Sequence, residues 1–225
     1  MNAQPSPPAG PSARRRLVLV GLSATVAALL AAALVLWLRP APEPAVVAAA
    51  PGATNNAVLR LPAGTDLGGP FNLVDQDDRP VTDATFAGKF MLIYFGFTYC
   101  PDVCPTEMQT MATAIDELGP SGDKVQPMLI SVDPERDRPS QLKDYVAAFH
   151  PRMMGLTGTD EQIAAVAKAY RVYYSKNAPD ADGAYNVDHT SFVYLMGPDG
   201  KLRSVFRGGA SPELMVAELK AQLAK

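Results

Sequence analysis

The two cysteines of this chain stand four positions apart, in a Cys-Pro-Asp-Val-Cys-Pro segment that begins at Cys100 and contains Cys104. An apolar and aromatic run at residues 90–97 comes directly before them and predicts a buried strand. Pro105 fits the first turn of a helix that should begin close to Cys104. The positive end of that helix would face both sulfurs, so we expect it to stabilise their thiolates.

This spacing permits two kinds of chemistry. If the loop coils back, the two Cα atoms can come within the roughly 4.4–6.8 Å that a disulfide requires. The same closeness would let both thiolates hold one soft metal ion. A purely structural disulfide would close so short a loop that it would add little stability. The cysteines alone therefore predict either redox activity or metal binding.

His189 favours the metal-binding alternative. It lies in an Asp-His-Thr segment just before a predicted strand at residues 191–196. Two thiolates and one imidazole suit copper, because thiolates favour Cu(I) while imidazole and a further oxygen suit Cu(II); zinc would require four ligands. We therefore expect Cys100, Cys104 and His189 to bind copper. The other histidine, His150, follows a predicted helix and is expected to be a capping or surface residue.

Two aspartates near these residues have two possible roles each. Asp188 precedes His189, and it either accepts a hydrogen bond that orients the imidazole or simply forms a turn. Asp133 follows a predicted buried strand, at the same sheet edge as the cysteines. It either lines the metal site or holds its loop by pairing with Arg136 or Arg138.

The order of the predicted elements determines the fold class. The predicted strands lie at residues 71–74, around 81, and at 90–97, 125–132, 153–156, 191–196 and 202–206, and the predicted helices at 106–118, 141–149, 160–170 and 212–223. This order is that of an α/β, thioredoxin-like domain with an N-terminal hairpin and inserted elements. Function in such sheets sits at the carboxyl ends of the parallel strands. The loop entering the strand at 191–196 should pack against the cysteine loop, and it carries His189 where thioredoxin-like enzymes have a cis-proline.

A membrane anchor is expected before this domain. Residues 17–38 carry no charged side chain, and as a helix they would be about 33 Å long, close to the roughly 30 Å hydrocarbon core of a bilayer. A cleaved signal peptide has a shorter apolar region. Three arginines end the segment 1–16, so the positive-inside rule places that segment in the cytoplasm. The Pro/Ala-rich residues 39–64 predict a tether, and residues 65–225 the exported domain.

Composition excludes several other classes of protein. Four of the 20 basic side chains and none of the 23 acidic ones lie in the first forty residues, so the main body is acidic. Nucleic-acid binding, which needs clustered Lys and Arg, is therefore not expected. A hydrophobic content of 48% excludes a disordered chain.

The short N-terminus lacks a clear organelle presequence, so we expect one span of a bacterial inner membrane with the domain in the periplasm.

Four segments of the sequence resemble motifs of the Sco/SenC family of copper proteins. Residues 96–107, Gly-Phe-Thr-Tyr-Cys-Pro-Asp-Val-Cys-Pro-Thr-Glu, look like the family's signature. Residues 131–137 and 188–190 resemble its second and third motifs, and residues 194–200 match as well. Many members have His where this chain has Tyr99, but that position is not a metal ligand in the family.

The resemblance implies a membrane-anchored copper metallochaperone with a thioredoxin fold. Family members bind copper, as Cu(I) or Cu(II), through two cysteines and a histidine, which in this chain are Cys100, Cys104 and His189. The implied partner is subunit II of cytochrome c oxidase, whose dinuclear CuA centre these proteins help to assemble. Another copper carrier is a second implied partner.

Two enzymatic functions compete with this delivery role. The alternative function is a thiol–disulfide oxidoreductase that reduces the cysteines of subunit II or of another exported copper protein. The CxxxC spacing, rather than CxxC, and the presence of His189 at the proline position argue against a simple oxidoreductase. A thiol peroxidase is the third hypothesis, but neither cysteine is flanked by the usual peroxidase partners.

Overall fold

The computed structural model describes residues 57–62, 65 and 67–225. The predicted cytoplasmic segment 1–16, the predicted anchor 17–38 and most of the predicted tether 39–64 lie outside these residues. Within the part of the chain that is described, no helix combines the length and the apolar character needed to cross a membrane.

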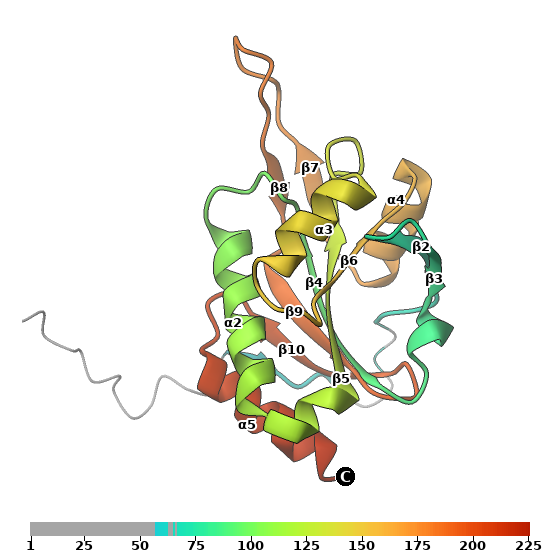
Figure 1. Cartoon of the computed structure of the whole chain (residues 1–225), viewed down its shortest axis with the longest axis vertical. Helices are drawn as coiled ribbons and strands as arrows, with labels where there is room; N and C mark the ends of the chain where they lie inside the picture. Colours follow the sequence, from blue (N-terminus) through green and yellow to red (C-terminus); the bar gives the residue numbers. More distant parts are fainter. Residues whose placement is uncertain (1–56, 63–64, 66) are drawn as a thin grey trace, which may run out of the picture. The chain divides into compact units, whose positions relative to one another are not determined.

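The centre of the domain is a mixed sheet whose middle strands are parallel. Strand β4 (Phe90–Gly96) pairs in parallel with β5 (Val125–Ser131), and β5 pairs in parallel with β6 (Met154–Thr157). Strand β9 (Phe192–Met196) runs antiparallel on the other side of β4 (Figure 1). Every residue of β4 is buried, as expected for a parallel strand that is covered on both faces. This arrangement confirms the predicted thioredoxin-like α/β class.

Further strands extend this sheet at both edges. The full order is β1-β10-β9-β4-β5-β6-β2-β3, in which β1 is Val58–Leu59, β2 is Asn72–Asp75, β3 is Pro80–Thr82 and β10 is Leu202–Arg207. The predicted N-terminal hairpin is the pair β2 and β3. Strand β1 pairs with β10, so the sheet includes two residues of the segment expected to be a tether. Two apolar residues in a Pro/Ala-rich stretch carry no detectable strand pattern.

Helices cover the sheet. They are α2 (Val103–Glu117), α3 (Pro139–Ala147), α4 (Asp160–Ala169) and α5 (Pro212–Leu223), with short 3-10 segments η1 (Asp83–Phe86) and η2 (Gly119–Lys124). Helices α2 and α5 pack against each other (Figure 1). Ser211 caps α5 as predicted, because its side chain accepts a hydrogen bond from the N–H of Leu214.

Three aromatic rings fix the strands that carry the site. Phe95 on β4 lies 5.4 Å from Tyr170, which follows α4, and 5.8 Å from Tyr194 on β9, measured between ring centroids. Tyr170 and Tyr194 are 5.7 Å apart. Tyr194 meets the other two rings edge-to-face, while Phe95 and Tyr170 are tilted by 51° to each other. Aromatic packing at these distances adds to the free energy gained from burial. The triad therefore holds β4 against β9 directly below the end of β4.

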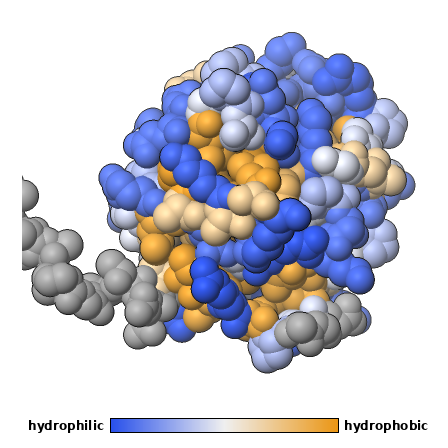
Figure 2. All heavy atoms as spheres, turned by 90° about the horizontal axis from the view of Figure 1, so that it is seen from below, coloured by the Kyte–Doolittle hydropathy of each residue, from blue (hydrophilic) through white to orange (hydrophobic). Residues whose placement is uncertain are grey.

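A small separate sheet was not predicted from the sequence. Strands β7 (Tyr174–Lys176) and β8 (Val187–His189) form an antiparallel hairpin that extends beyond one end of the main sheet (Figure 1). His189 is therefore the last residue of a strand, not part of an irregular loop before β9. Figure 2 shows the domain from below, where hydrophobic surface (orange) lies between hydrophilic side chains (blue).

Candidate metal centre

The two cysteines occupy the turn between β4 and α2. Helix α2 begins at Val103, one residue before Cys104, as the position of Pro105 predicts. Cys104 is fully buried, whereas Cys100 is half-buried, and neither forms a disulfide. The backbone N–H of Cys104 donates a hydrogen bond to Sγ of Cys100 over 3.4 Å. This N–H is one of those that a helix leaves unpaired at its start, and the sulfur of Cys100 is its partner.

Gly96 makes room for the buried sulfur. A Cβ atom at Gly96 would lie 3.0 Å from Sγ of Cys104 and 2.8 Å from the ring of Tyr94. The bare backbone at the end of β4 therefore lets the first turn of α2 approach the sheet closely.

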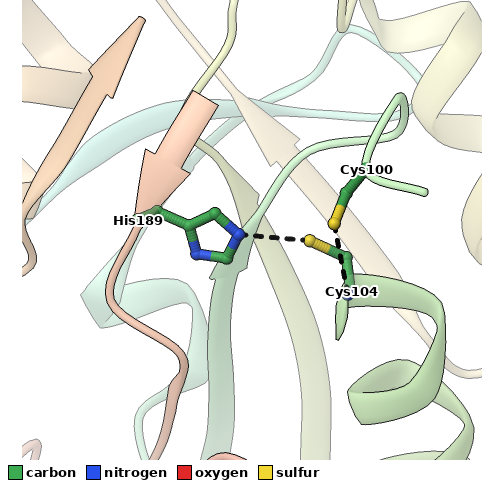
Figure 3. Close-up of side chains that lie close together, drawn as sticks. All are labelled: Cys100, Cys104 and His189. Carbon is green, nitrogen blue, oxygen red and sulfur yellow. Dashed lines mark hydrogen bonds between the residues drawn. The ribbon is translucent and has the colours of Figure 1, made fainter. Parts of the chain in front are cut away.

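His189 presents one ring nitrogen to the sulfurs. Its Nε2 lies 3.3 Å from Sγ of Cys104 (Figure 3), and its Nδ1 lies 3.1 Å from the carbonyl oxygen of Thr190. Because a carbonyl oxygen can only accept, Nδ1 carries the proton and the lone pair of Nε2 faces the sulfurs. The rings of Tyr94 and Phe97 meet the imidazole edge-on, with centroids 6.0 and 5.8 Å away.

The three side chains form a group with the size of a metal site. One ligand atom from each of Cys100, Cys104 and His189 lies within 4.8 Å of the other two. Metal bonds to sulfur and nitrogen are about 2.0–2.3 Å long, so atoms at these separations can share one ion after small side-chain rotations. Burial lowers the pKa of His189, so its imidazole is neutral at neutral pH, which is the form that binds metals.

The environment of Cys104 differs from the expectation that the helix would stabilise both thiolates. Burial, followed by the hydrogen bond with Cys100, raises the pKa of the Cys104 thiol well above its ordinary value. Desolvation of the charged form outweighs the hydrogen bonds with Phe97 and Tyr94, which favour the thiolate. The hydroxyl of Tyr94 lies 3.8 Å from Sγ of Cys104 and 3.4 Å from Oγ of Ser191. Binding of a metal ion would therefore have to displace a proton from Cys104.

The two aspartates lie outside this group. Asp188 is exposed, and its carboxylate accepts a hydrogen bond from the side chain of Asn177 over 3.4 Å, while Nδ1 of His189 is taken by the backbone. Asp133 is fully buried and binds Arg136 and the hydroxyl of Tyr185. Of its two possible roles, the structure shows Asp133 holding its loop through Arg136.

Other residues that support the cysteine loop were not singled out from the sequence. Asp137 is fully buried and accepts hydrogen bonds from the N–H and hydroxyl of Thr98, at 2.9 and 2.6 Å, and from the hydroxyl of Ser131. It thereby ties the loop after β4 to the end of β5. Asp137 lies within a recognised motif, but a motif by itself does not show which loop a side chain reaches.

The second histidine, His150, is buried, and its Nδ1 accepts a hydrogen bond from the N–H of Arg152.

The chain matches the family model described as SCO1/SenC over residues 60–224. The human mitochondrial Protein SCO1 homolog is 47% identical over 142 residues, which are 62% of this chain and 47% of that protein. Protein sco1 of Schizosaccharomyces pombe is 45% identical over 162 residues, 71% of this chain and 62% of that protein. The chain thus spans roughly half the length of the curated relatives that it matches.

Solved structures of similar proteins contain copper. Arabidopsis thaliana ScoI with copper bound is 42% identical, with a TM-score of 0.67, and the match covers 70% of this chain and 98% of that one. Bradyrhizobium japonicum ScoI with copper bound is 46% identical, with a TM-score of 0.65 and coverages of 69% and 99%. A 28% identical structure, BsSco, is described as a member of the Sco family of cytochrome c oxidase assembly proteins with a disulfide switch; its TM-score is 0.57, with coverages of 74% and 98%.

Proposed function

Because this chain belongs to the SCO1/SenC family, we propose that it is a copper metallochaperone of cytochrome c oxidase assembly. Copper is its cargo, held by Cys100, Cys104 and His189 and delivered to the CuA site of subunit II. The observation that carries the proposal is the meeting of two sulfurs and one neutral imidazole within 4.8 Å. The copper in solved relatives that are more than 40% identical supports the choice of metal.

The different exposure of the two sulfurs suggests the order of transfer. Cys100 is partly open to solvent, whereas Cys104 is buried against Gly96 and Tyr94. An incoming thiolate of the target can replace Cys100 first, and Cys104 and His189 hold the ion until a second target ligand arrives. Cys104 then regains a proton, because burial favours its neutral form.

A thiol–disulfide oxidoreductase is the alternative, and the proximity of the two cysteines favours it. Sγ of Cys100 lies 3.4 Å from the backbone nitrogen of Cys104, so the loop already brings the pair together. In such a reaction the two thiols would lose two protons and two electrons. A Cys100–Cys104 disulfide would form while the target disulfide is reduced to two thiols.

We place the domain on the outer side of a bacterial inner membrane. The uncharged stretch 17–38, the three arginines before it and the Pro/Ala-rich residues after it support one anchoring span and a tether. A tethered domain would search for its membrane-bound target near the surface of the bilayer.

A paired transfer experiment separates the two functions. Full-length protein in mild detergent is loaded with copper and mixed with reduced, copper-free subunit II fragment, and CuA formation is followed by its visible absorption. In parallel, copper-free reduced protein is mixed with the oxidised fragment, and released thiols are counted. We expect His189→Ala to abolish copper transfer and to leave thiol exchange largely intact.

The control for loss of an imidazole is His150→Gln, since His150 lies outside the metal group. It should transfer copper as the parent does. If the parent transfers no copper but reduces the fragment, the oxidoreductase function replaces the chaperone function.

A further inference from the structure

Arg136 lies where three segments around the metal group meet. It belongs to the loop after β5. On one side it faces Phe97 and Tyr99 of the cysteine loop, and on the other it faces Tyr185, in the connection between β7 and β8. That connection ends in the strand that carries His189. The side chain of Arg136 is 19% exposed, so these segments enclose most of its guanidinium.

Arg136 contacts the β7–β8 connection through Tyr185. Its Nη1 donates to the carbonyl oxygen of Tyr185 over 2.9 Å, and its guanidinium carbon lies 3.6 Å from the centroid of the Tyr185 ring. The hydroxyl of Tyr185 donates to Oδ1 of Asp133 over 2.9 Å, and Nε of Arg136 donates to Oδ2 of the same carboxylate. Arg136, Tyr185 and the buried Asp133 therefore hold one another in a single geometry.

The contacts of Arg136 with the cysteine loop are made by aromatic rings. Its guanidinium carbon lies 4.7 Å from the centroid of Tyr99 and 5.7 Å from that of Phe97. Phe97 in turn meets the ring of His189 edge-on. The guanidinium thus links the hairpin to the two loop residues that flank the imidazole and the cysteines.

Few other contacts hold the hairpin: of its six strand residues, Val187 alone is buried in the core. Its strands have three residues each and pair only with each other among the described strands, and an isolated two-stranded hairpin is marginally stable at best. At its base, Tyr173 and Thr190 exchange two hydrogen bonds. Farther out, Lys176 reaches Glu135 over 2.7 Å and the buried carboxylate of Asp133 over 3.7 Å. Lys176 and Glu135 are both substantially exposed, so their ion pair contributes little.

We propose that Arg136 is a positioning residue, a clasp that holds the His189-bearing hairpin over the cysteine pair and so sets how fast copper is released. Opening the clasp would let the hairpin, and Nε2 of His189 with it, move away from the sulfurs. The copper part of this inference rests on the proposed function, whereas the hairpin part concerns the metal-free protein alone.

The test uses hydrogen exchange of the full-length, reduced, copper-free protein in detergent. Arg136→Lys keeps the charge but loses the planar fork and the stacking face. We expect amides at residues 174–189 to exchange about tenfold faster, since charge-assisted hydrogen bonds and cation–π contacts of this kind shift an equilibrium by about that factor or more. Amides of β4 and β5 should be unchanged. Arg138→Lys is the matched control, because Nε of Arg138 donates to the backbone oxygen of Glu135 on the exposed side.

A second readout is copper release. Copper-loaded parent and variants are mixed with an excess of a chromophoric chelator, and we expect release from Arg136→Lys to be about tenfold faster. Tyr185→Ala removes the ring that stacks on Arg136 and the hydroxyl that binds Asp133, and it keeps the backbone carbonyl and the Arg136–Asp133 pair. It should therefore act in the same direction. It also serves if Arg136→Lys does not fold.

The outcomes are distinct. Faster exchange confined to the hairpin, with faster release, supports the clasp. Exchange at 174–189 within twofold of the parent in both variants overturns it, as does exchange that rises equally in β4 and β5. If the parent binds no copper, the proposed function fails, but the exchange experiment still decides whether Arg136 holds the hairpin.

Discussion

The backbone N–H of Cys104 points at the sulfur of Cys100, 3.4 Å away, although the two side chains differ sharply in exposure. Cys104 packs beneath the loop against β4, while Cys100 faces partly outward. The first turn of α2 therefore donates a hydrogen bond to the accessible sulfur of Cys100, whereas burial raises the pKa of the inaccessible thiol of Cys104. The two thiols should behave differently in solution even though only three residues separate them.

The first prediction concerns their reactivity with an alkylating reagent. Because burial both hides Cys104 and raises the pKa of its thiol, we expect iodoacetamide at pH 8 to modify Cys100 at least about tenfold faster in the reduced protein. Peptide mapping by mass spectrometry at several reaction times gives both rates. Equal rates would show that the first turn of α2 opens readily, contrary to the packing described.

The second prediction concerns the glycine below Cys104. Gly96→Ala places a methyl group 2.8 Å from the ring of Tyr94 and 3.0 Å from Sγ of Cys104, so the ring must shift and the sulfur is crowded. We expect copper affinity to fall and the free energy of unfolding to fall by about 1–3 kcal/mol, as for other overpacked sites. Chelator competition and urea unfolding measure the two quantities.

Gly69→Ala is the control for this substitution. Its added methyl group would meet only Cβ of Ala169, at 3.6 Å, which is ordinary contact. Its stability and copper affinity should match the parent. A Gly96→Ala protein that also matches the parent would contradict the close approach of α2 to β4.

The third prediction is a pH dependence away from the metal group. Burial alone would raise the pKa of Glu218, but hydrogen bonds from Arg60, Ser204 and Gln222 outweigh it, and the pKa lies below its ordinary value of 4.5. The carboxylate thus contributes stability that is complete above about pH 4.5 and is lost as pH falls through the lower, folded-state pKa. Arg60 is largely exposed, so solvent weakens its share.

Glu218→Gln should therefore destabilise the protein by about 1–3 kcal/mol at pH 7, mainly through Ser204 and Gln222. The difference from the parent should shrink as pH falls from about 4.5 through the lower, folded-state pKa, because Glu218 then becomes neutral in the parent too. Urea unfolding of both proteins across this range measures it. A difference that stays constant with pH would mean that the charge of Glu218 contributes nothing.

The sequence predicts those parts of the fold that carry a strong local pattern. Strand β4 is a continuous apolar run, Pro105 indicates the start of α2, and the order of elements brings His189 to the cysteine loop. The hairpin of β7 and β8 escapes prediction, because strands of three residues are too short to show a period of two. Strand β1 escapes for the same reason.

The site shows a similar division. Residue types and spacing single out the two cysteines and the histidine, which the structure brings together. The extent to which burial raises the pKa of Cys104 depends on packing density, which no local pattern records. Whether Asp133 faces the metal group or pairs with Arg136 depends on where Tyr185 lies, and that residue is 52 positions away.

The most direct test of the copper site is X-ray absorption of the full-length, reduced protein loaded with one equivalent of Cu(I). We predict two sulfur neighbours and one nitrogen neighbour per copper in the parent. In His189→Ala the nitrogen neighbour should disappear and the affinity for copper should fall. A parent spectrum without sulfur neighbours, or a His189→Ala protein with unchanged spectrum and affinity, would contradict the assignment of these three residues as the copper ligands.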